Sequence, residues 1–176
     1  MSSSKVLVLG ANGMLGKMVA LYLNSLKDLV VDITSRSKNA FVVENFDGNY
    51  YLFDANSYNL NPLEEIIKVS DYDCIVNCIG VIKPKINENE AESINNTILV
   101  NSYFPLDIHK VALKNNVNYI QIGTDCVFSG MEGQYTEDSF KDALDLYGKS
   151  KIAGEIEGNS KTVIRSSIIG PEQGSG

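Results

Sequence analysis

Short apolar runs alternate with helix-period segments along most of the chain. The run Lys5–Gly10 predicts a strand that ends at a glycine, and the segment Gly13–Leu26 after it places its apolar residues on one helical face. Further strands are predicted at the other apolar runs, which are Leu29–Thr34, Tyr50–Ala55, Asp73–Gly80, Val117–Gly123 and Lys161–Ser167. This alternation predicts an α/β fold, a doubly wound parallel sheet with helices on both faces and right-handed crossovers.

Helical patterns fill most of the connections between these strands. A long helical region from Glu92 to Asn115 contains Pro105, which predicts a kink or a break. The stretch "LYGKSKIAGE", Leu146–Glu155, predicts an amphipathic helix with Tyr147 and Lys151 one turn apart on one face. The segment 39–48 has to connect two strands but shows no clear helix.

The glycines of "GANGMLG" follow a predicted strand and open a helix. Such a turn allows pyrophosphate to approach the backbone, and the helix N-terminus supplies amides and partial positive charge. The spacing differs from G-x-G-x-x-G, and it is not a P-loop because Met18 follows Lys17. A tight structural turn is the alternative. The cofactor-binding residues predicted in this turn are Gly10, Asn12, Gly13, Met14, Leu15 and Gly16.

The residues after the second strand bear on the choice of cofactor. An acidic residue at the end of this strand would favour NAD, but Asp32 lies inside the strand. The sequence "SRSK" follows and supplies Arg36 and Lys38, a cationic pair suited to a 2′-phosphate. We therefore predict NADP (NADPH) as the cofactor, with Arg36 in its site and NAD as the alternative. A solvated basic loop would give the same pattern.

Charge and cysteine content exclude several classes of function. The net charge of −7 argues against nucleic acid as a partner, because a phosphate-binding face needs a basic surplus. Three cysteines without a framework spacing, and a single histidine, indicate reduced thiols and no metal site. The chain shows neither a signal peptide nor an apolar run long enough to span a membrane, so we expect a cytoplasmic location.

Several motifs then occur in one characteristic order. They are "GANGMLG", "FDA", "NCIG", "GTDCVFSG", "YTE", "YGKSKIAGE" and "VIRSS". This series resembles the extended short-chain dehydrogenase/reductases, and most closely their dTDP-4-dehydrorhamnose reductase group of sugar-nucleotide reductases. The resemblance covers essentially the whole chain. It implies a Rossmann-like NAD(P)-binding domain over residues 1–170, with residues 171–176 beginning a truncated or flexible C-terminal region.

The resemblance also implies roles for individual residues. Asp54 and Ala55 match the segment that lies against adenine. The strand end near the cofactor ribose corresponds to Asn77, Cys78, Ile79 and Gly80. The catalytic triad corresponds to Thr124, Tyr147 and Lys151, of which Tyr147 and Lys151 are also expected to contact the cofactor. Asn101 matches an asparagine of the helix behind the site.

The chemistry of these side chains agrees with ketone reduction. Hydride transfer leaves an alkoxide that must be protonated, and a free tyrosine, with a pKa near 10, is a sluggish donor at neutral pH. The Lys151 ammonium is expected to lower the pKa of Tyr147. Thr124 can bind and orient the substrate oxygen. Without the other motifs, an exposed helix face would explain Tyr147 and Lys151 equally well.

Some features depart from the family pattern. Cys126 stands where a tyrosine is usual, and Ala143 where a proline is common in the catalytic loop. Family members also carry a smaller C-terminal lobe that grips the sugar nucleotide, and almost none of it is present here. We therefore expect this lobe to be largely missing from the chain.

These observations lead to one leading hypothesis of function. It is NADPH-dependent reduction of a nucleotide-linked 4-keto-6-deoxy sugar in cell-surface carbohydrate biosynthesis. One alternative is a non-catalytic NADP-binding regulatory protein, a role that the same family contains in the regulatory subunit of methionine adenosyltransferase. Another is a sugar-nucleotide epimerase or dehydratase. The expected partner is the nucleotide-linked sugar, and a homodimer is left open.

Overall fold

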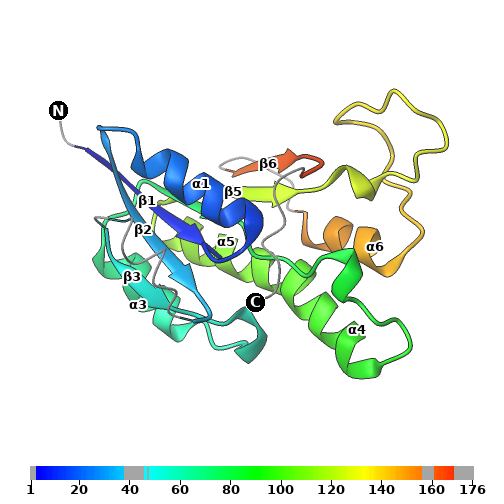
Figure 1. Cartoon of the computed structure of the whole chain (residues 1–176), viewed down its shortest axis with the longest axis horizontal. Coiled ribbons are helices and arrows are strands. Elements are labelled where there is room, and N and C mark those ends of the chain that lie inside the picture. Colours follow the sequence, from blue (N-terminus) through cyan, green and yellow to red (C-terminus); the bar gives the residue numbers. More distant parts are fainter. Residues whose placement is uncertain (1–2, 38–45, 47, 156–160, 169–176) are drawn as a thin grey trace.

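The computed structural model of the protein describes residues 3–37, 46, 48–155 and 161–168. Within them the chain forms a six-stranded sheet, parallel throughout, in the order β3-β2-β1-β4-β5-β6 (Figure 1). The strands are β1 (Ser4–Leu9), β2 (Leu29–Ser35), β3 (Tyr50–Leu52), β4 (Cys74–Asn77), β5 (Asn118–Gly123) and β6 (Lys161–Arg165). The helices are α1 (Met14–Asn24), α3 (Asn61–Val69), α4 (Ala91–Ile98), α5 (Phe104–Lys114) and α6 (Leu146–Gly154).

The strand order reverses direction between β1 and β4. The chain runs outward from β1 through β2 to β3, and then returns to the other side of β1 as β4. Loops leaving the carboxyl ends of β1 and β4 therefore diverge, and they leave a crevice between them. The predicted α/β class and parallel sheet are confirmed, and this crevice is where the fold places a ligand.

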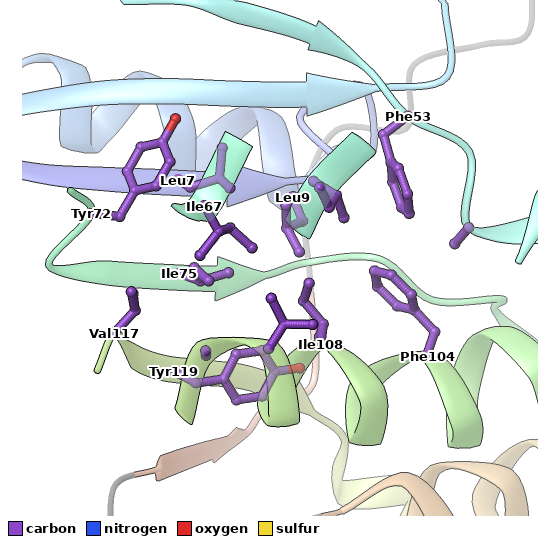
Figure 2. Close-up of a cluster of buried hydrophobic side chains, with 14 of the residues drawn as sticks. Leu7, Leu9, Phe53, Ile67, Tyr72, Ile75, Phe104, Ile108, Val117 and Tyr119 are labelled. Carbon is purple, nitrogen blue, oxygen red and sulfur yellow. The ribbon is translucent and has the colours of Figure 1, made fainter. Parts of the chain in front are cut away.

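Both faces of the sheet are buried, as continuous apolar strands require. Side chains alternate along β1, so that Leu7 and Leu9 enter one core while Val6 and Val8 enter the other. The first core is closed by α3 and α5, and the second by α1. Figure 2 shows the first core, in which the rings of Phe53 and Phe104 face one another with centroids 5.6 Å apart.

Three strands end two or three residues earlier than the sequence pattern predicts, and β6, which ends at Arg165 and not at Ser167, is one of them. The other two end where a polar side chain caps the turn that follows. The strand predicted over Tyr50–Ala55 ends at Leu52, because Asp54 caps a short 3₁₀ turn (Ala55–Ser57) by accepting the Asn56 amide at 3.0 Å. The strand predicted over Asp73–Gly80 ends at Asn77, whose side-chain oxygen accepts the Ile79 amide at 3.0 Å. In both places a polar side chain satisfies a backbone amide and turns the chain away from the sheet.

The break predicted at Pro105 takes the form of a wider turn within a continuous helix. One turn of π-helix, Leu99–Tyr103, joins α4 to α5, and Pro105 lies in the first turn of α5. A proline cannot donate to the carbonyl four residues earlier, here Asn101, and its ring crowds that carbonyl. The wider turn relieves this crowding, and it sets the Asn101 side chain toward α6.

Three predictions fall on other parts of the chain. Lys38, most of the segment 39–48, and the domain boundary at residue 170 lie outside the described residues. Within the described part, every helix is too short or too polar to cross a lipid bilayer.

Candidate active site

The turn between β1 and α1 is fixed by close backbone contacts. The amides of Gly10 and Ala11 donate to the carbonyl of Thr34 at 3.1 and 2.8 Å, so the turn is tied to the end of β2. Gly10 has a φ of +85°, a conformation that favours glycine. A Cβ at Gly16 would lie 2.2 Å from the Gly10 carbonyl oxygen. The glycines therefore allow α1 to begin directly against the turn.

The N-terminus of α1 has the features of an anion site. Its cap, Gly13, offers no side chain, and the first turn carries no acidic residue. The amide of Lys17 makes a helical bond to the Gly13 carbonyl at 2.9 Å, so the amides of Met14, Leu15 and Gly16 precede that bond. These amides and the helix dipole favour a negatively charged group at this end.

A cavity of about 430 Å³ opens at the carboxyl ends of β1 to β4. Its lining includes nine of the residues that the sequence assigned to cofactor binding, namely Gly10, Asn12, Gly13, Arg36, Asp54, Ala55, Cys78, Ile79 and Gly80. The sequence reasoning missed seven more, namely Ser35, Phe53, Asn56, Val81, Lys85, Asn96 and Val100. Asn96 and Val100 lie four residues apart, a spacing that places them on one face of the predicted helix. This spacing is the sequence signal from which their shared position could have been predicted.

One buried atom in this wall has no hydrogen-bond partner among the residues that the structure describes. Asn12 donates through Nδ2 to the Ser37 carbonyl at 2.9 Å, whereas its Oδ1 is buried without a hydrogen bond among the described residues. Such an oxygen is normally satisfied. Together with the glycine turn and the bare N-terminus of α1, it makes the cavity a fitting site for a dinucleotide that brings a hydrogen-bond donor.

Arg36 and Asp32 occupy different environments. Arg36 is exposed and lines the cavity just past the end of β2. Asp32 is fully buried inside β2, where it accepts from the Asn49 amide at 2.7 Å and from the Tyr72 hydroxyl. Burial raises the pKa of Asp32, but these hydrogen bonds outweigh it and leave that pKa lowered. Asp32 thus serves the packing of β2, and Arg36 is the charged residue that follows β2 at the cavity.

The three residues predicted as a catalytic triad come from two neighbouring elements. Thr124 is buried after β5, and its hydroxyl accepts the Cys126 amide at 3.2 Å. Tyr147 and Lys151 lie on α6, and Thr124 is near enough to Tyr147 to lower the pKa of its phenol. The Lys151 ammonium is buried and donates to the Ile122 carbonyl at 3.0 Å.

Thr124, Tyr147 and Lys151 do not line the cavity, but the Lys151 ammonium lies close to its wall. A Cβ at Gly80 would lie 3.7 Å from Lys151 Nζ and 3.4 Å from Asn101 Oδ1. The buried ammonium is therefore just behind the loop that forms the cavity wall. This places Lys151 next to the cavity, with Tyr147 one helical turn before it on α6.

The electrostatics of the pair differ from the expectation. Burial raises the pKa of Tyr147, and its contact with Thr124 lowers it only in part. Burial leaves the pKa of Lys151 below its ordinary value, and the charge of Glu155 offsets this effect only in part. The expected lowering of the Tyr147 pKa is thus not found, because desolvation of the phenol dominates and Lys151 is not among the groups that shift this pKa.

Asn101 joins the elements behind the site. Its Oδ1 accepts the Val81 amide at 2.8 Å, and its Nδ2 donates to the Val81 carbonyl at 3.0 Å and to Ser150 Oγ at 3.1 Å. Ser102 adds a bond to the Ser150 carbonyl at 2.8 Å. The π-helical turn thereby holds both the loop after β4 and helix α6.

A second hollow, also about 430 Å³, lies against Asp125 and Cys126, the two residues that follow Thr124. The rings of Phe128 and Tyr135 stack there with centroids 4.5 Å apart. Asp125 and Cys126 face it as well, and Cys126 is exposed. Its walls are formed by Asp125, Cys126, Phe128, Gly130, Tyr135, Thr136, Glu137 and Arg165. Sequence reasoning did not group these residues, because the long loop before α6 folds back to complete the hollow.

The other departure from the family pattern is a packing residue. Ala143 is buried, and its amide donates to the Val127 carbonyl at 3.1 Å.

The described residues contain no group of three or more His, Cys, Asp or Glu side chains that could hold a metal ion.

Comparison with known proteins extends these observations. The RmlD substrate binding domain family matches residues 4–173. A methionine adenosyltransferase 2 subunit beta from Danio rerio is 29% identical over 158 residues, which are 87% of this chain and 43% of that protein. The chain spans less than half the length of the curated relatives it matches.

Solved structures share the fold at low identity. A hypothetical dTDP-4-dehydrorhamnose reductase from Sulfolobus tokodaii superposes with a TM-score of 0.74 at 23% identity, over 92% of this chain and 55% of that one. A Bacillus anthracis dTDP-4-dehydrorhamnose reductase in complex with NADP gives 0.70 at 21% identity, over 94% and 54%. With a family match over nearly its whole length, the chain belongs to the RmlD substrate binding domain family.

Proposed function

We propose that the protein is the cofactor-binding part of an NADPH-dependent reductase that acts on a nucleotide-linked 4-keto-6-deoxy sugar. One observation carries the proposal: the Lys151 ammonium lies directly behind the wall of a cavity fitted for a dinucleotide, one helical turn after Tyr147 on α6. Family membership supports it, as do solved relatives that are reductases, one of them in complex with NADP.

The described residues account for cofactor placement. The glycine turn and the amides at the start of α1 would hold the pyrophosphate, and Asp54 and Ala55 would border the adenine. Arg36 would face the ribose 2′-hydroxyl region, where its guanidinium suits a phosphate and favours NADP over NAD. When bound, the nicotinamide supplies the hydride.

The catalytic residues would manage the proton and the substrate orientation. Thr124 would donate a hydrogen bond to the sugar carbonyl and fix its direction. Tyr147 would deliver the proton to the oxygen as the alcohol forms. The raised pKa of Tyr147 keeps the phenol protonated at neutral pH, although it also makes the phenol a weaker acid. We further propose that the sugar enters from the hollow of Phe128 and Tyr135.

Two other functions compete with this one. The curated relatives named as methionine adenosyltransferase subunits favour a non-catalytic regulatory role. Epimerase or dehydratase chemistry would keep the same cofactor. Dehydration needs an additional acid–base pair, and Cys126, after Thr124 and Asp125, is a weak acid without a nearby histidine in the sequence to activate it.

The experiment measures NADPH oxidation by the full-length protein with a panel of nucleotide-linked ketosugars. We expect oxidation that depends on the sugar and disappears in Tyr147→Phe. Tight NADPH binding without oxidation for any sugar would favour the regulatory role.

A further inference from the structure

Residues 81–90, which form most of the loop between β4 and α4, contact both halves of the site. Val81 and Lys85 line the dinucleotide cavity. Between them, Lys83 begins a short 3₁₀ turn (Lys83–Lys85), and its side chain reaches Asp145 at the start of α6. This loop is therefore a direct structural link between the cavity and α6.

Lys83 forms an ion pair with the residue that caps α6. Its Nζ lies 2.5 Å from Asp145 Oδ2, while Asp145 Oδ1 accepts the Gly148 amide at 2.8 Å. The Lys83 ammonium lowers the pKa of Asp145, and the carboxylate raises the pKa of Lys83. One oxygen of the Asp145 carboxylate thus binds the loop, and the other binds the first turn of α6, which contains Tyr147.

Two further contacts connect the same loop to α6. Glu88 Oε1 accepts the Leu146 amide at 3.3 Å near the far end of the loop. At its near end, Asn101 bonds both Val81 and Ser150. Of these links, only the pair of Lys83 and Asp145 connects the cap of α6 to the part of the loop that contains Lys85.

We propose that Lys83 and Asp145 are positioning residues that couple occupation of the dinucleotide cavity to the placement of Tyr147. The proposal rests on the proposed function, since it takes the cavity as the NADPH site and Tyr147 as the proton donor. An exposed ion pair contributes little to global stability. Its effect is local, and a proton donor misplaced by about 1 Å can lower the rate roughly a hundredfold.

Hydrogen exchange with and without NADPH tests the coupling in the 176-residue chain. In the wild type, saturating NADPH slows exchange in residues 81–90 and in the first turn of α6. In Lys83→Met, we expect the loop to keep its protection and α6 to lose it. Asp145→Asn keeps a capping oxygen and should behave in the same way. The double variant should add nothing further, because both changes break one interaction.

Two variants distinguish positioning from a general structural effect. Lys83→Arg keeps the charge and should restore the protection of α6. Lys110→Met removes an equally exposed pair, Lys110 with Asp107 at 2.8 Å on α5, and should leave both segments unchanged. In a full-length version, Lys83→Met should lower kcat about tenfold or more with the KM for NADPH unchanged.

The outcomes separate this proposal from the proposed function. Persistent NADPH protection of α6 in Lys83→Met overturns the coupling. The coupling is also overturned if calorimetry shows that NADPH binds the wild type but NADPH does not slow hydrogen exchange in α6. A failure of NADPH to bind at all overturns the proposed function, and the coupling with it.

Discussion

Replacement of Glu155 by glutamine should destabilise the protein strongly. Glu155 follows the end of α6, and its side chain is 2% exposed. Oε1 accepts Arg165 Nε at 2.8 Å, and Oε2 accepts Arg165 Nη2 at 2.9 Å and Lys141 Nζ at 2.8 Å. The carboxylate therefore joins α6 to β6 and to the loop before α6. Glutamine keeps the size of the side chain but removes its charge.

The size of the effect follows from the burial of the carboxylate. Removal of one partner from a buried ion pair costs about 3–5 kcal/mol, because the remaining charge is left uncompensated. Arg165 and Lys141 are 19% and 18% exposed, so water can solvate them in part. We therefore expect a loss of about 3 kcal/mol. For a chain of this size that lowers the unfolding midpoint by roughly 6–12 °C.

Thermal and urea denaturation followed by circular dichroism measure this loss. Burial raises the pKa of Glu155, but the bonds from Arg165 and Lys141 outweigh it and leave that pKa below its ordinary value of 4.5. The difference from wild type should be complete above pH 4.5 and should vanish as the pH falls through the lowered pKa. Glu65→Gln, at an exposed position of α3, should change stability by less than about 0.5 kcal/mol. A Glu155→Gln variant as stable as this control would refute the reasoning.

Three further changes test the site directly. Tyr147→Phe should leave NADPH affinity nearly intact and abolish turnover in a full-length version, and wild-type turnover would show that another group protonates the product. Arg36→Ala should weaken NADPH binding roughly tenfold or more by calorimetry, through loss of a charged hydrogen bond, while NADH affinity stays the same; equal losses for both cofactors would contradict the 2′-phosphate assignment. Gly16→Ala should weaken the binding of both cofactors and lower the free energy of unfolding by about 1–3 kcal/mol, because its Cβ would lie 2.2 Å from the Gly10 carbonyl oxygen. Unaltered cofactor binding and an unaltered melting temperature would count against the packed turn.

The strands and the cavity could be predicted because they depend on local pattern. Side chains of the apolar run of β1 alternate between the two cores, so the burial of Leu7 and Val8 can be predicted without knowing which residues they contact. Parallel strands place their carboxyl ends at one edge, and this brought Gly10, Arg36 and Gly80 to one cavity although they are distant in sequence.

The remainder depends on contacts between distant segments. Asn101 contacts Val81 and Ser150, which lie 20 and 49 residues away, so neither the π-helical turn nor its purpose is visible in the helix pattern. The pairing of Lys83 with Asp145 spans 62 residues. The expected lowering of the Tyr147 pKa relied on its spacing from Lys151, whereas the packing that buries the phenol decides the direction.

Mass spectrometry of the sugar product from a full-length version tests the central claim most directly. The protein would be supplied with NADPH and a nucleotide-linked 4-keto-6-deoxy sugar. The proposed reduction predicts a mass gain equal to a hydride plus a proton, with one NADPH consumed for each sugar. A loss of water, or an unchanged mass with NADPH left intact, would contradict it.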